Sequence, residues 1–133
     1  MKILVEETLR RFPEISPLLF EGDEELSYVV MIALADWLQS LPSRKVITPP
    51  LVERITSFTQ WCEGQARGKD AGDDIWTIFV IGFFEHLFDS EVTRPLIPKL
   101  IPYENLVQNA EYLHKWVGHD DYEKALKCYK NST

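Results

Sequence analysis

The segment DDIWTIFVIGFFEHLFD, residues 73–89, restricts the fold of this chain most strongly, because no charge interrupts its run from Ile75 to Phe84. Apolar side chains would point in almost every direction around a helix, and a helix that is apolar all round is buried all round. A buried strand is the alternative, since these residue types favour strands. The segment is too long for an ordinary strand, however, and no other stretch reads as a pairing partner.

We therefore expect a central helix at about 74–89, with other helices packed on at least two of its sides. Asp73 and Asp74 suit its N-terminus, where carboxylates accept hydrogen bonds from free N–H groups and meet the positive end of the helix dipole. Helical spacing leaves only a narrow stripe for solvent, which consists of Ile78, Gly82, Glu85 and Asp89.

Eight prolines separate the other apolar stretches and fall between helices or at helix starts, where proline does least harm. Thr48 is expected to cap one helix, Gly118 to end another, and Asp120 to cap the last. The predicted helices are 2–12, 24–41, 49–63, 74–89, 103–117 and 121–130. At 133 residues, the chain fits one all-α domain, residues 1–133, in which about six helices form a compact bundle around the buried one.

The charge balance limits the partners of this protein. Lys and Arg total 14 against 21 Asp and Glu, which gives a formal net charge of −7. Phosphate backbones and anionic membranes repel such a chain, so we expect no direct binding to nucleic acid or to a membrane. A basic protein, in contrast, would be attracted.

The compartment is inferred from the N-terminus and the cysteines. MKILVEETLRRF is no signal peptide, because Glu6 and Glu7 follow its short apolar run. The longest uncharged apolar run is half of what a membrane crossing needs. Two cysteines, Cys62 and Cys128, are too few for a disulfide framework. We expect reduced thiols in a cytoplasmic protein.

No group of residues specifies a chemistry. Glu85 and His86 are adjacent, and adjacent side chains on a helix diverge by about 100°, so this pair is not expected to act as an acid–base couple. The only group that resembles metal ligands consists of His114, His119, Asp120 and Asp121. Its spacing matches no HExxH or carboxylate-bridged pattern. We expect no enzyme, no bound metal and no cofactor.

The positions of the acidic residues carry the one functional signal. If helices 24–41, 49–63 and 74–89 alternate in direction, as short connections usually require, three of their ends meet. If the helix from 103 runs back, the start of the last helix joins them. The carboxylates that this acidic end offers to a partner are Glu21, Asp23, Glu24, Glu25, Asp70, Asp73, Asp74, Asp120 and Asp121. Glu63 and Glu123 would lie nearby.

Two interpretations of these acids compete. Acids favour helix starts and acidic loops keep proteins soluble, so the acidic end is a solvated surface in one interpretation. In the other it is a binding face, because the run EGDEE places four carboxylates in five residues, more than a cap requires.

With its single-domain size, its acidic run EGDEE and its aromatic helix IWTIFVIGFFEHLF, the chain resembles the small, acidic, all-helical immunity proteins of bacterial toxin–immunity systems. The resemblance extends over the whole chain and identifies no functional residue. It implies an inhibitor that occludes the active site of a cognate toxin, a basic nuclease or another nucleic-acid-modifying enzyme. Carboxylates would take the place of phosphate, and exposed Tyr or Trp side chains would anchor the complex.

Two further functions remain open. One is a non-enzymatic scaffold or adaptor, a short HEAT-like helical array that binds a peptide or helix in an apolar groove. The other is a housekeeping domain whose acids only keep it soluble.

Overall fold

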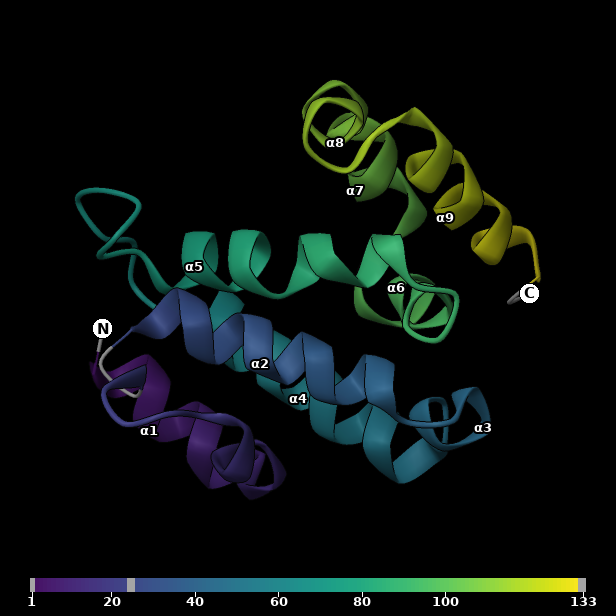
Figure 1. Cartoon of the computed structure of the whole chain (residues 1–133). Coiled ribbons are helices and arrows are strands. Elements are labelled where there is room, and N and C mark those ends of the chain that lie inside the picture. Colours follow the sequence, from purple (N-terminus) through teal and green to yellow (C-terminus); the bar gives the residue numbers. More distant parts are fainter. Residues whose placement is uncertain (1, 24–25, 132–133) are drawn as a thin grey trace.

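Helices make up most of the part of the chain that the structure describes, residues 2–23 and 26–131 of a computed structural model (Figure 1). The α-helices are α1 (Lys2–Arg11), α2 (Ser27–Ser40), α3 (Ser43–Val46), α4 (Pro49–Glu63), α5 (Ile75–Gly82), α6 (Ile97–Leu100), α7 (Tyr103–Gln108), α8 (Ala110–Val117) and α9 (His119–Asn131). The 3-10 helices are η1 (Pro13–Leu18), η3 (Phe84–Asp89) and η4 (Arg94–Leu96). Within these residues there is no strand, which confirms the all-α class. None of these helices combines the length and the apolar character needed to cross a membrane.

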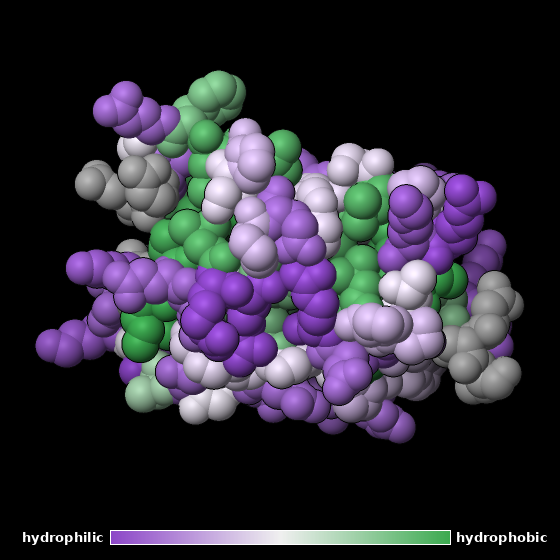
Figure 2. All heavy atoms as spheres, turned by 90° about the horizontal axis from the view of Figure 1, so that it is seen from below, coloured by the Kyte–Doolittle hydropathy of each residue, from purple (hydrophilic) through white to green (hydrophobic). Residues whose placement is uncertain are grey.

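The helices lie in layers (Figure 1). α2 and α4 run in opposite directions and both contact α5, while α1 packs against them from the other side. α8 and α9 contact η3 on the side that faces away from α1. Viewed from below, the middle of the molecule's face is hydrophilic (Figure 2). On α1, Glu7 pairs with Arg10 and Arg11.

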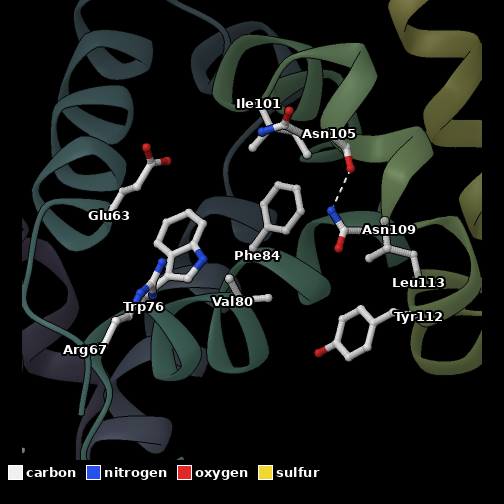
Figure 3. A pocket seen from close by; sticks show the side chains of 10 residues that line it. All are labelled: Glu63, Arg67, Trp76, Val80, Phe84, Ile101, Asn105, Asn109, Tyr112 and Leu113. Atoms are coloured by element: carbon white, nitrogen blue, oxygen red, sulfur yellow. Dashed lines mark hydrogen bonds between the residues drawn. The ribbon is translucent and has the colours of Figure 1, made fainter.

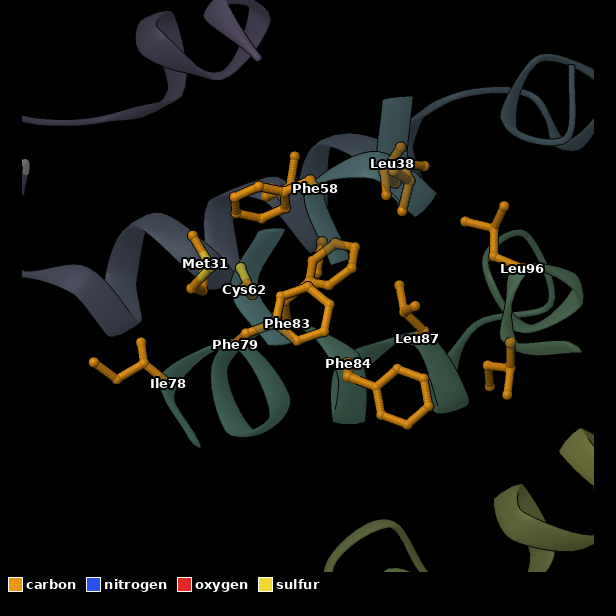
Figure 4. Close-up of a cluster of buried hydrophobic side chains, with 14 of the residues drawn as sticks. Met31, Leu38, Phe58, Cys62, Ile78, Phe79, Phe83, Phe84, Leu87 and Leu96 are labelled. Carbon is orange, nitrogen blue, oxygen red and sulfur yellow. The ribbon is translucent and has the colours of Figure 1, made fainter. Parts of the chain in front are cut away.

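The predicted central helix 74–89 is wrong in one respect, because it is two helices and not one. The chain leaves α-helical geometry at Phe83, where φ is −119° and ψ is −61°, and continues as the 3-10 helix η3. The aromatic side chains at this point have different partners. Phe83 points toward α4, whereas Phe84 points toward α8 and Leu113 (Figures 3 and 4). Neighbouring side chains on any helix diverge by about 100°, so the two phenylalanines have different partners with or without the break.

The predicted solvent stripe is also wrong. Ile78 and Gly82 are buried, and the backbone of Gly82 lies against Met31 of α2. Asp89 is exposed as expected, but Glu85 is half-buried and Ile81 takes the exposed position. Gly82 has no side chain, so α2 can lie directly against it. The stripe was predicted from helical spacing within the segment, which does not show where a neighbouring helix packs.

The predicted helix 103–117 is broken at Asn109, into α7 and α8. The Asn109 side-chain amide donates to the carbonyl oxygen of Asn105 over 2.7 Å, a local bond that competes with helix continuation. The last helix begins at His119, so Asp120 lies inside its first turn and does not cap it. Thr48 precedes α4 without a side-chain cap, whereas Gly118, with φ +90°, ends α8 as expected.

The core is built on a chain of aromatic rings that runs from Phe12, directly after α1, to Phe58 of α4 and on to Phe79 and Phe83; Figure 4 shows the last three. The rings of Phe12 and Phe58 lie 5.6 Å apart, those of Phe58 and Phe79 5.8 Å, and those of Phe79 and Phe83 5.2 Å. Each of the four is almost fully buried, and burial of such a side chain contributes about 1.5–3 kcal/mol. This core holds the ends of α2, α4 and α5 in place.

Candidate functional site

A tight turn before α2 presents an aromatic side chain to solvent. The N–H of Phe20 donates to the Asp23 carboxylate over 2.8 Å, and the N–H of Asp23 donates back to the Phe20 carbonyl over 3.0 Å. Gly22 supplies the positive φ, +93°, that the third position of a type II turn needs. Phe20 is 80% exposed, and Glu21 is exposed beside it.

Two other large apolar side chains flank this turn. Leu18 precedes it at the end of η1, and Leu26 follows it ahead of α2; each is about half exposed. In the segment 13–20, which also contains Leu18 and Phe20, only Ile15 is fully buried. All three side chains are apolar, so polarity alone cannot distinguish the exposed Leu18 and Phe20 from the buried Ile15. We define the apolar tip as Leu18, Phe20 and Leu26.

The loop that leads into α5 lies at the same end of α2 as the apolar tip (Figure 1). The Tyr28 hydroxyl in the first turn of α2 donates to the carbonyl oxygen of Ala71 over 2.9 Å. Burial raises the pKa of Tyr28, and the nearby charges of Asp70 and Asp74 raise it further. Glu21 and Asp23 therefore share one end of the molecule with Asp70 and Asp73. The side chains of Asp70 and Asp73 are exposed.

Asp74 belongs to this end but is used by the fold. It is buried and accepts hydrogen bonds from the N–H and hydroxyl of Thr77, over 3.0 and 2.6 Å, and from the N–H of Gly68 over 2.8 Å. Arg67 lies 3.6 Å away. The Thr77 hydroxyl, the Gly68 N–H and the charge of Arg67 hold the pKa of Asp74 below its ordinary value. Asp74 caps α5, as its position in the sequence suggested, and its carboxylate is not free for a partner.

Asp120 and Asp121 lie elsewhere. α9 is on the opposite side of Figure 1 from the loop that carries Asp70 and Asp73. Asp121 lies 3.5 Å from a guanidinium nitrogen of Arg94, a buried residue that also donates to the Phe88 carbonyl over 2.9 Å. Two of the predicted acidic residues are thus separate from the others, and Glu24 and Glu25 lie outside the described residues.

A groove separates the end of α4 and α5 from α7 and α8 (Figure 3). Its volume is about 370 Å³. The residues that line it are Glu63, Arg67, Trp76, Val80, Phe84, Ile101, Asn105, Asn109, Tyr112 and Leu113. Trp76, Val80 and Phe84 follow one another at helical spacing and form an apolar face that α2 and α4 do not cover. This spacing is the sequence signal that would have revealed the groove.

An aromatic pair borders this groove. The rings of Tyr112 and Trp116 on α8 lie 6.0 Å apart, and Trp116 is 60% exposed. The Tyr112 hydroxyl donates to the Glu85 carboxylate over 2.7 Å. Burial raises the pKa of Glu85, against the opposing effect of this bond. Glu85 thus faces Tyr112, while the imidazole of His86 lies 4.0 Å from Asp89, so the two neighbours diverge as expected.

The four predicted metal-ligand candidates are not one cluster. His114 and His119 do come together, but with Glu123 in place of Asp120 and Asp121. One ligand atom from each of these three side chains lies within 4.8 Å of the others. The signal for Glu123 was its spacing of four residues from His119, which puts both on one face of α9.

Comparison of the chain with protein-family models, with curated proteins and with solved structures finds no match. Its function is therefore inferred from the surfaces described above.

Proposed function

We propose that this protein is a non-enzymatic inhibitor of the immunity type, which docks its acidic end on a basic partner, a toxin domain. One observation carries the proposal. Phe20 is 80% exposed on a turn closed by two hydrogen bonds, with Glu21 and Asp23 in the same turn. A large aromatic side chain held in solvent between carboxylates fits a surface that is covered by a partner.

The two kinds of side chain have different tasks in such a complex. Aromatic anchors supply most of the affinity of protein interfaces, and burial of Phe20 would contribute about 1.5–3 kcal/mol. The exposed carboxylates of Glu21, Asp70 and Asp73 would steer a basic surface toward the apolar tip, and the net charge of −7 acts in the same direction. In the active site of a nuclease, these carboxylates would occupy the place of phosphate.

The test is co-expression with any protein that is encoded beside this gene and is toxic when expressed alone. Wild-type protein is expected to restore growth, and the purified pair is expected to lose association rate steeply as the ionic strength rises. Phe20→Ala is expected to weaken the complex by at least tenfold. Ile47→Ala is the control, because Ile47 is also an exposed apolar residue but lies beside α3, at the other end of α2. Equal affinity of Phe20→Ala and wild type would refute the proposal.

A second candidate, the scaffold or adaptor, is favoured by the groove of Figure 3. Its apolar lining of Trp76, Val80 and Phe84 and its polar rim of Asn105 and Asn109 suit the apolar face of an amphipathic helix. Val80→Glu would place a charge in the groove and abolish such binding, while Phe20→Ala would leave it unchanged. Salt would have little effect on the association rate of such a complex. Phe20→Ala, Val80→Glu and one series of salt concentrations therefore distinguish the inhibitor from the adaptor.

A further inference from the structure

The corner between α8 and α9 brings three possible ligand side chains together. His114 lies in the last turn of α8, and Gly118, whose N–H donates to the His114 carbonyl over 3.2 Å, is the single residue between the two helices. α9 then begins at His119, and Glu123 follows one turn later on the same face. The reversal at Gly118 therefore places the end of one helix beside the start of the next.

The imidazole of His114 is held in place by rings. Its centroid lies 4.2 Å from that of Tyr122, which is buried, and 5.2 Å from that of His119, both in edge-to-face orientation. The Nε2 atom of His114 is buried, yet it has no hydrogen-bond partner among the described residues. A buried polar atom without a partner is unfavourable and calls for an explanation. Coordination through Nε2 would replace the missing hydrogen bond with a metal–nitrogen bond.

The donor set is one that zinc uses. Two imidazoles and one carboxylate, with a water in the fourth position, form a known tetrahedral arrangement with bonds of about 2.0–2.2 Å. Ligand atoms around such an ion are separated by roughly 3.4 Å, given those bond lengths. The three atoms here lie within 4.8 Å of one another, so rotamer changes of His119 and Glu123 would suffice to close the site. In the part of the chain that the structure describes, no ion pair joins Glu123 to Lys127, which lies one helical turn further along α9.

We propose that His114, His119 and Glu123 form a binding site for a divalent cation of the zinc class. The ion would link the last turn of α8 to the first turns of α9. α8 also carries Tyr112 and Leu113, which line the groove, so a bound ion would hold one wall of the groove in a defined position. The site is separate from the apolar tip and does not depend on the proposed inhibitor function.

The experiment is titration of the full chain with Zn²⁺ by calorimetry, together with the visible absorption of the Co²⁺ form. Wild-type protein is expected to bind one ion with an affinity in the micromolar range and to give the intense bands of tetrahedral Co²⁺. Zn²⁺ should also raise the unfolding temperature, because an ion that binds only the folded state stabilises it. His119→Ala and Glu123→Gln, which change side chains at the surface, should each weaken binding by at least tenfold.

Three controls make the result decisive. His86→Ala removes the remaining histidine, Asp120→Asn a carboxylate beside the site, and Cys128→Ser the thiol of α9; all three should bind Zn²⁺ as the wild type does. Absence of saturable binding would overturn the proposal. So would full binding by both His119→Ala and Glu123→Gln, or loss of binding in Cys128→Ser.

Discussion

Gly82 of α5 and Met31 of α2 lie so close that a Cβ atom on residue 82 would be 2.7 Å from the Cβ of Met31. Real Cβ atoms do not approach that closely, so these two helices meet at a point where only glycine fits. The contact explains why α5 is covered by α2 on a face that the sequence assigned to solvent.

Gly82→Ala should therefore destabilise the protein. Helix propensity alone favours alanine by up to about 1 kcal/mol, whereas overpacking of a core costs about 1–3 kcal/mol. The Cβ of Met31 cannot swing away like the end of a flexible side chain, so the clash should prevail, with a net loss on the order of 1 kcal/mol. Urea unfolding measures it. Gly72→Ala is the control, since its Cβ would meet only the Asp70 side chain at 3.5 Å. A stabilised Gly82→Ala would show that the helices separate easily.

Arg94→Met should destabilise the protein by about 1.5–3 kcal/mol, the range for hydrogen bonds of charged groups. Methionine preserves most of the buried stem but leaves the Phe88 carbonyl without its 2.9 Å donor and Asp121 without its partner. Thermal or urea unfolding measures the change. Arg44→Met, at an exposed position on α3, should stay within about 0.5 kcal/mol of wild type. Equal stability of the two variants would contradict a linking role for Arg94.

Asp74 should make the fold sensitive to acid. Its pKa is lowered in the folded protein, above all by the Thr77 hydroxyl, so its contribution is fully present above the pKa of the unfolded chain, about 3.9. That contribution is lost as the pH falls through the lower, folded pKa. Glu7 and Glu14, whose pKa values are lowered by hydrogen bonds from Arg10 and Arg54, act in the same direction.

The measurement is urea unfolding between pH 7 and pH 2. Asp74→Asn should be less stable than wild type at pH 7, and the difference should shrink as the pH falls below about 4. Asp73→Asn, one residue away and exposed, should follow the wild-type curve. A difference between Asp74→Asn and wild type that stays constant with pH would show that charge has no part in the cap.

Cys62 should be unreactive in the folded protein. It is buried, and burial raises the pKa of its thiol to about 12, so almost no thiolate exists at pH 8. The Cys128→Ser variant, which retains Cys62 alone, should react with a disulfide reagent only after denaturation. Reaction of this variant under native conditions at the rate of an unfolded chain would place Cys62 outside the core. The Cys62→Ser variant reports on half-buried Cys128, whose reaction should be slow but measurable.

Some elements were predictable because their signals are local. The helix 49–63 has the predicted bounds, since Pro49 and Pro50 define its start and Leu51, Ile55, Phe58 and Cys62 recur at helical spacing. The break at Phe83 was not predictable. Every residue from Ile75 to Phe84 except Thr77 and Gly82 is apolar, so the sequence contains no local mark of the point where the α-helix ends and the 3-10 helix begins.

The candidate sites divide in the same way. Short connections predicted that α2, α4 and α5 alternate in direction, and this brings Glu21 and Asp23 to the end that carries Asp70 and Asp73. The burial of Asp74 and the pairing of Asp121 with Arg94 depend on contacts between distant residues. Pattern reasoning has no access to such contacts.

By itself, the sequence determined the helical class, one helix to its last residue, and the net charge of −7. These follow from hydrophobic period, proline positions and composition, which are properties of neighbouring residues or of the whole chain. The tertiary structure alone decided that Phe20 stays in solvent, that Gly82 meets Met31, and that His114 joins His119 and Glu123. Helical period states which side chains share a face; only the packing of one helix on another determines which faces are covered.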